Sequence, residues 1–206
     1  NIQKINVGIY HGSTNASGFS MLIDNFVTYS SNDYAAIVAE ISELASPAVA
    51  SLVEDFENGV SSVSPWMVDN NATWSEEKDA PLSGKSSLFM SSVNSSGCYI
   101  TFPAAVGVKN LGLRIKTTGT VGILRIGANG NDAHNKRADS ATGYEELTTE
   151  NFVFTNAEGT VLTDVASYDT AWGGLRFNQE FDGYIFIPND NNIDIQKINI
   201  GIFHGS

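Results

Sequence analysis

Apolar and polar residues alternate along most of this chain with the two-residue period of strands that bury one face. The pattern predicts strands over 2–10 and 19–29, joined as a hairpin by a turn of Gly, Asn and Ser at 12–18. After residue 50 it continues in short segments separated by turn residues: 52–57, 64–69, 85–91, 97–102, 110–116, 121–128, 151–155, 160–165, 173–177, 181–187 and 194–203. Many short strands at this spacing predict an all-β antiparallel sandwich or barrel.

One segment follows a helical period instead. Its apolar residues recur at steps of three and four, and Asn32 and Asp33 precede them as caps: Tyr34, Ile37, Val38, Ile41, Leu44 and Ala45. We predict one short helix in a connector at 32–49, with its apolar stripe lying on the sandwich. Glu40 and Glu43 stand where a membrane-surface helix would carry lysines.

The opening of the chain is repeated at its end. Residues 1–13 (NIQKINVGIYHGS) and 194–206 (DIQKINIGIFHGS) agree at ten of thirteen positions and lie 193 residues apart. A period this long indicates tandem whole domains rather than a solenoid. We therefore expect residues 1–31 to be the last two strands of a preceding repeat, 32–49 a connector, and 50–206 a sandwich that lacks its final strand.

The strand at 19–29 has three possible places. It can complete the sandwich of its own chain, insert into a neighbouring molecule, or belong to the preceding copy. Because their sequences are nearly identical, 1–13 and 194–206 should occupy the same strand position in a sandwich. A domain closed within this chain would then contain one more copy of that strand than it needs. The preceding copy is our preferred interpretation.

The composition excludes some classes of binding partner. The formal charge is −12, with 11 Lys and Arg against 23 Asp and Glu, which argues against nucleic acid and anionic membrane surfaces. No stretch approaches the ~20 apolar residues that span a bilayer, so we expect no membrane insertion. No basic and apolar leader precedes Asn1, and we expect any such element in other parts of a longer chain. Acidity of this degree is usual for secreted bacterial modules, so we expect an extracellular or cell-surface location.

The single cysteine excludes an internal disulfide framework and a cysteine-ligated zinc site. Cys98 lies in GCYITF, where alternation places it on one face with Ile100 and Phe102. We interpret it as a buried, inert thiol, since no histidine or positive charge nearby would activate it.

Several motifs together resemble a known family. VEDFENG at 53–59, GKSSL at 84–88, GLRFNQEFDGYIFIP at 174–188, LIDNF at 22–26 and the closing repeat are similar to jelly-roll β-sandwiches of bacterial carbohydrate-binding modules. This galactose-binding-like architecture recurs in large surface proteins that bind polysaccharides. The resemblance implies a structural Ca²⁺ held by Asp55 and Glu57 of the first strand and Asp24 of the last. The alternative is that Asp55 and Glu57 are solvated and that Asp24 bonds only to backbone.

The resemblance also implies a sugar site in which aromatic rings face pyranose rings and polar groups bind hydroxyls. The polar loop 129–149 is a natural place for it. We expect Trp66 in the core and Trp74 exposed among polar neighbours that include Asn70 and Asn71. The candidate ligand-binding residues are Trp74, Tyr144, Trp172, Asn131, Asp132 and His134.

Catalysis has little support in the sequence. His11 and His204 are one position in two copies, and His134 stands apart from both, so no triad or histidine metal cluster is indicated. Abundant Asp and Glu leave a glycosidase pair of carboxylates open. We predict a non-catalytic carbohydrate-binding repeat of a secreted or cell-surface protein, whose partners are a polysaccharide and neighbouring copies. The alternative is a structural filament or adhesin repeat completed by strands of its neighbour.

Overall fold

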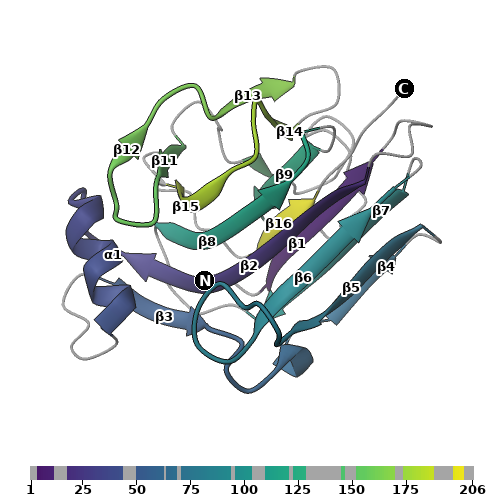
Figure 1. Ribbon diagram of the computed structural model, residues 1–206, viewed down its shortest axis with the longest axis horizontal. Helices are drawn as coiled ribbons and strands as arrows, with labels where there is room; N and C mark the ends of the chain where they lie inside the picture. Colours follow the sequence, from purple (N-terminus) through teal and green to yellow (C-terminus); the bar gives the residue numbers. More distant parts are fainter. Residues whose placement is uncertain are drawn as a thin grey trace.

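The computed structural model describes residues 4–11, 18–43, 50–62, 64–68, 71–93, 96–103, 110–120, 123–128, 145–146, 152–169, 174–187 and 197–201. Its strands form two eight-stranded sheets (Figure 1). The first sheet has the order β13 (Ala166–Asp169), β14 (Gly174–Phe177), β9 (Ile123–Ala128), β16 (Lys197–Gly201), β1 (Lys4–His11), β7 (Ser96–Pro103) and β4 (Ser64–Val68), with β10 (Glu145–Glu146) beside β9.

The second sheet has the order β12 (Val161–Leu162), β11 (Val153–Thr155), β15 (Asp182–Ile187), β8 (Leu111–Thr118), β2 (Phe19–Tyr29), β6 (Ser87–Ser92) and β5 (Ala72–Glu77), with β3 (Ala50–Glu54) beside β2. Among the described pairings, every pair is antiparallel except that of β1 with β16. The predicted all-β antiparallel fold with one short helix is confirmed.

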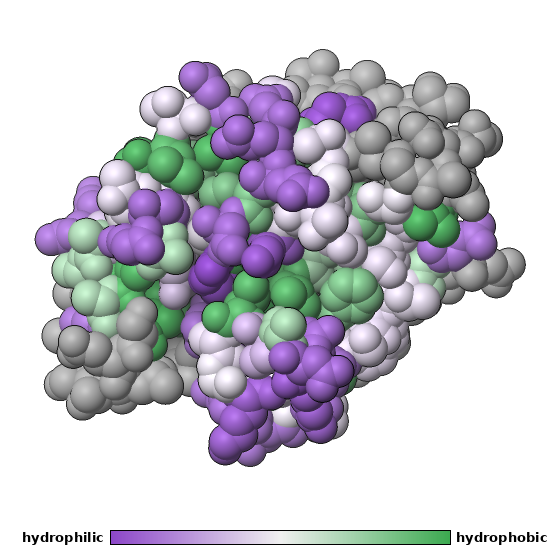
Figure 2. Space-filling view, viewed as in Figure 1, coloured by the Kyte–Doolittle hydropathy of each residue, from purple (hydrophilic) through white to green (hydrophobic). Residues whose placement is uncertain are grey.

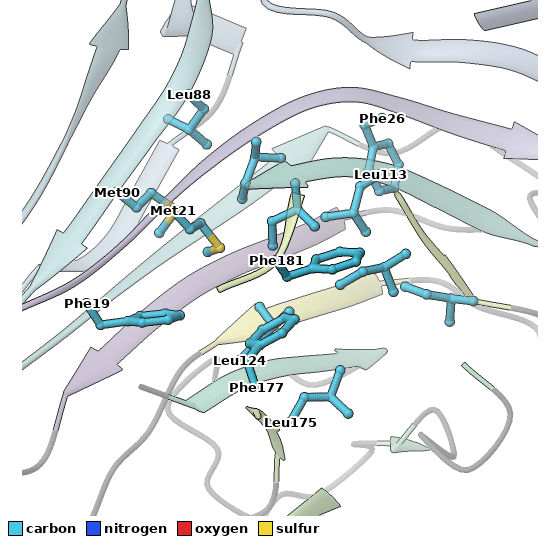
Figure 3. Close-up of a cluster of buried hydrophobic side chains, with 14 of the residues drawn as sticks. Phe19, Met21, Phe26, Leu88, Met90, Leu113, Leu124, Leu175, Phe177 and Phe181 are labelled. Carbon is cyan, nitrogen blue, oxygen red and sulfur yellow. The ribbon is translucent and has the colours of Figure 1, made fainter. Parts of the chain in front are cut away.

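Inward side chains of both sheets build one hydrophobic core. Met21, Phe26 and Leu113 enter it from the second sheet, and Leu124 and Phe177 enter it from the first. Phe181, just before β15, lies between the two sheets and stacks on Phe177 with ring centres 5.8 Å apart (Figure 3). Cys98 of β7 is buried in the same core, as predicted. Truncating one of these phenylalanines would cost about 3–5 kcal/mol.

The opening strands do not form the predicted hairpin. β1 pairs with β7, β9 and β16 in the first sheet, whereas β2 lies between β6 and β8 in the second. Both sheets therefore combine strands of 1–31 with strands of 50–206, and β2 pairs with β6 and β8 of the same chain. The assignment of 1–31 to a preceding repeat stays a prediction of the sequence.

Helix α1 (Tyr34–Glu43) begins at the predicted cap, where the Asp33 carboxylate accepts a 3.1 Å hydrogen bond from the Ala36 amide. It lies across one end of the second sheet (Figure 1). Its apolar stripe packs on the outer side of that sheet, as the spacing predicted: Ile37, Val38 and Ile41 against Val27, Tyr29, Tyr184 and Phe186. In the described part of the chain, no helix has both the length and the apolar character needed to cross a membrane.

Three strands were missed at the level of sequence, namely β5, β10 and β13. β5 lies where the sequence suggested an exposed polar segment, and β13 follows a two-residue strand that was predicted to be longer. A one-turn 3-10 helix, η1 (Val60–Ser62), joins β3 to β4. The missed β5 matters most for function, because it carries Trp74 and forms the free edge of the second sheet beside β6.

Candidate functional site

The three predicted calcium ligands lie on β2 and in the loop after β3. Asp24 lies at an irregularity in β2, where the register against β8 shifts and Asn25 adopts a φ of 40°. Asn tolerates this left-handed conformation better than most residues. Asp55 and Glu57 follow β3 in the loop that leads to η1, and both line an open pocket of about 420 Å³ with Asn25.

Asp24 is fully buried and ties β2 to the loop before β6. Its Oδ1 accepts from the Asn25 amide at 2.8 Å, and its Oδ2 accepts from the Ser83 amide at 3.2 Å and the Ser87 hydroxyl at 2.6 Å. Burial raises the pKa of Asp24 to about 6, although these three hydrogen bonds oppose the rise. The carboxyl group therefore joins two segments at the cost of removing a charge from water.

The other two carboxylates also accept hydrogen bonds from the protein. Asp55 accepts from the Glu57 amide at 3.1 Å, and Glu57 accepts from the Lys85 amide at 2.7 Å. Oxygen donors of this kind suit Ca²⁺. However, among the described residues no three Asp, Glu, His or Cys side chains are close enough together to hold a metal ion. The hydrogen bonds hold these carboxylates in place, and the calcium site stays a prediction of the resemblance.

A second open pocket of about 480 Å³ adjoins the first and shares Glu57 with it. Lys78 Nζ lies 2.9 Å from Glu76 Oε2 at its wall, and the hydrogen bond from Lys78 is the main reason that the pKa of Glu76 is lowered. The charges at this wall already compensate one another.

The predicted exposure of Trp74 is wrong. Along β5, Ala72 is buried and Thr73 and Ser75 are exposed, so alternation turns Trp74 inward. Its ring is half-buried and packs against the core. The polar residues around Trp74 belong to the solvent side of an edge strand, and the indole is on the other side.

The remaining predicted ligand-binding residues lie outside the described residues: Asn131, Asp132, His134, Tyr144 and Trp172. Trp66 belongs to β4. The structure thus places Asp55 and Glu57 at one pocket that Asn25, beside Asp24, also lines. The loop 129–144 is left as a prediction of the sequence.

A different surface combines the groups that sugars require. We call it the open face: the outward residues of β8, β2, β6 and β5 that do not contribute to the cluster under α1. Cross-strand pairing aligns Lys116, Leu22, Phe89 and Ser75 in one row. The chain neighbours of Leu22 and Phe89 point into the core: Met21, Ile23, Leu88 and Met90. Leu22 and Phe89 therefore face outward, and both are half-buried.

A second row of the open face consists entirely of hydroxyl residues. Thr118, Ser20, Ser91 and Thr73 are successive cross-strand partners. The Thr73 and Ser91 hydroxyls lie 2.8 Å apart and share a hydrogen bond. Because side chains two apart on a strand lie on the same face, this row runs directly beside the row of Leu22 and Phe89.

Charged residues border the open face on the side of β15. Asp182 bonds to the guanidinium of Arg114, and its other oxygen lies 3.3 Å from Lys116 Nζ. Burial would raise the pKa of Asp182, but the bonds and charges of Arg114 and Lys116 outweigh it and lower that pKa. Arg114 also donates to the Gly183 carbonyl at 2.9 Å and lies 5.5 Å from the Tyr184 ring centre. This anchored group offers both donors and acceptors to a ligand.

Sequence reasoning missed the open face. The run SLFMSS in β6 has three adjacent apolar residues, so the pattern alone does not say that Phe89 is the outward one. Alternation with Ser87 and Ser91 was the signal that could have found it. Comparisons with family models, with curated proteins and with solved structures find no match to this chain. The case for a function therefore depends on the chain's own residues.

Proposed function

We propose that this chain is a non-catalytic carbohydrate-binding repeat of a secreted or cell-surface bacterial protein, and that the glycan lies on the open face. The observation that supports this most directly is the row of Leu22 and Phe89 beside the row of four hydroxyl residues. Pyranose rings have apolar faces and hydroxyl edges, so they match two such adjacent rows.

The dimensions of the open face suit a short oligosaccharide. Four strands spaced ~4.8 Å apart place about 14 Å between the outer strands β8 and β5. Phe89 lies within this span, one strand from the β5 edge, where a ring has room to lie on it. Lys116 and Asp182 at the β8 end can bind hydroxyls as donor and acceptor.

The distribution of apolar surface favours a ligand of mixed polarity. In the face shown in Figure 2, apolar areas are small and are separated by hydrophilic residues. Among the described residues, Val161 is the one large hydrophobic side chain that is exposed, at 54%. A wide apolar patch for a protein partner would look different, which supports a glycan as the ligand of this surface.

The Phe89→Ala variant should weaken polysaccharide binding about tenfold or more, because it removes the only aromatic ring among the residues of the open face. Affinity electrophoresis in gels containing different bacterial and plant polysaccharides measures the retardation of each variant. Val161→Ala is the matched control, since it also truncates an outward apolar residue of the second sheet but lies on β12 at the other edge. Equal retardation of the Phe89 variant and the unmodified chain, or no retardation in any gel, contradicts the proposal.

Calcium stays a prediction of the family resemblance. If the site exists, calcium should raise the melting temperature and a chelator should lower it, because an ion bound only by the folded state stabilises that state. Asp55→Asn should then abolish the difference. The hydrogen-bonded arrangement of Asp24, Asp55 and Glu57 described above needs no ion and expects equal melting temperatures. Differential scanning calorimetry with calcium and with chelator distinguishes the two.

A further inference from the structure

The two copies of the repeated segment lie side by side in the first sheet (Figure 1). β1 and β16 pair in parallel, and their register sets identical residues of the two copies next to each other. Lys4 lies beside Lys197, and Asn6 lies beside Asn199. Because neighbouring strands are ~4.8 Å apart, the pairing brings two lysines of the repeat to one place on the sheet.

Register and alternation assign these lysines to the outer side of the sheet. Ile9 is a cross-strand partner of both Leu124 and Cys98, and both partners are buried in the core. Cross-strand partners share a face, and residues five apart on one strand belong to opposite faces. Lys4 and its partner Lys197 therefore belong to the outer side. Helix α1 packs on the other sheet and does not cover this one.

The outer side of the first sheet differs in charge from the chain as a whole. We call the outward residues of β9, β16, β1 and β7 the repeat face. These four strands, as the structure describes them, contain Lys4, Lys197 and Arg125 and no Asp or Glu. Glu146 of β10 lies at the margin, as the partner of Gly127. In a chain with a formal charge of −12, the repeat face is positively charged.

The cationic residues stand at the two ends of a polar strip. Gly8 and Gly201 are equivalent positions of the two copies, and both are partners of Arg125. Arg125 therefore lies four residues along the strands from the lysine pair, or ~13 Å. Asn6 and Asn199 come between the lysines and the glycines. Adjacent glycines let an extended ligand approach the backbone closely.

We propose that the repeat face binds an acidic polysaccharide, with carboxylate or sulfate groups at the lysine pair and at Arg125. Asparagine amides offer donors and acceptors for sugar hydroxyls. Tyr99, the partner of Gly8, adds an aromatic residue to the same face, as suits a pyranose ring. Physiological salt screens the acidic remainder of the chain beyond ~8 Å, so the charges in contact decide the binding. This site is independent of the open face, which belongs to the second sheet.

Binding to immobilised polymers tests the repeat face. Polygalacturonate supplies carboxylates and dextran sulfate supplies sulfates, and methyl-esterified polygalacturonate and dextran are their uncharged counterparts. The unmodified chain should bind at least one charged polymer about tenfold more tightly than its counterpart, and added salt should weaken that binding. The double variant Lys4→Gln with Lys197→Gln should lose about tenfold in affinity for the charged polymer. Lys4→Arg with Lys197→Arg keeps both charges and should retain it.

Two controls separate this site from net charge and from the open face. Lys78→Gln with Lys85→Gln removes the same charge from the segment between β5 and β6 and should leave the affinity unchanged. Phe89→Ala should also leave the preference for charged over uncharged polymer unchanged, because Phe89 belongs to the other sheet.

Three results would overturn the proposal. The first is equal affinity of the unmodified chain and the Lys4→Gln, Lys197→Gln variant for the charged polymer. The second is no preference for either charged polymer, which includes no binding to both. The third is polyphosphate binding as tightly as the acidic polysaccharides, because polyphosphate has the charge without the sugar.

Discussion

The Asp24→Asn variant is expected to lose a pH dependence of stability that the unmodified chain has. In the folded chain the pKa of Asp24 is about 6, against an ordinary value of 3.8, because burial disfavours the charged form. The folded state therefore holds this proton more tightly than the unfolded state. The resulting stabilisation is fully present below pH 3.8 and is lost as pH rises through about 6.

The size of this effect follows from the shift. About two pKa units correspond to about 3 kcal/mol in the free energy of unfolding, lost between pH 4 and pH 7. Urea unfolding at intervals across this range measures it, and subtracting the Asp24→Asn profile removes the contributions that the two proteins share. Asp182→Asn is the comparison of opposite sign, because Arg114 and Lys116 lower the pKa of Asp182 and make its contribution disappear at low pH.

Calcium would reverse the sign for Asp24. An ion bound to the carboxylate favours the charged form and lowers its pKa, so stability would then rise with pH. Parallel profiles of the unmodified chain and Asp24→Asn from pH 4 to pH 7 would contradict the buried, proton-holding carboxyl group described here. A profile that rises with pH only when calcium is present would support the family's metal site instead.

Local alternation was enough to predict most strands, because a strand that buries one face has apolar and polar residues at alternate positions. Phe19, Met21 and Ile23 illustrate this, since all three are buried and their neighbours Ser20 and Leu22 are not fully so. Alternation fails at Asp24 and Asn25, where the change of register lets Phe26 enter the core and turns Val27 outward under α1. A change of register depends on the partner strands, and one sequence does not contain that information.

For the candidate sites too, the sequence predicts which residues take part but not how distant segments contact them. Asp55 and Glu57, which the resemblance implied as calcium ligands, line a pocket that Asn25, the neighbour of Asp24, also lines. The resemblance could not show that Glu57 accepts a hydrogen bond from the Lys85 amide, because Lys85 comes from a distant loop. Likewise, the repeat itself was visible in the sequence. The common register of Gly8 and Gly201 against Arg125 appears only when both strands are placed beside β9.

Replacing Gly159 by Ala is expected to lower the free energy of unfolding by about 3 kcal/mol and to loosen α1. Gly159 is buried in the turn between β11 and β12 with a φ of 82°, which an L side chain rarely adopts. A Cβ there would lie 2.6 Å from the Ala35 Cα and 2.9 Å from the Tyr34 carbonyl oxygen. The helix backbone would have to move, and the packing of Ile37 and Ile41 on the sheet would suffer.

Urea unfolding gives the global loss, and amide hydrogen exchange shows where it arises. Faster exchange in α1 than in the strands of the core is expected, because the contact lies at the first turn of the helix. Glu158→Ala is the matched control in the same turn, since its side chain is exposed and its effect should stay within about 0.5 kcal/mol. Adding Ala35→Gly should not restore stability, because the close atoms belong to the helix backbone. Wild-type stability in the Gly159 variant would show that α1 is not seated on this turn.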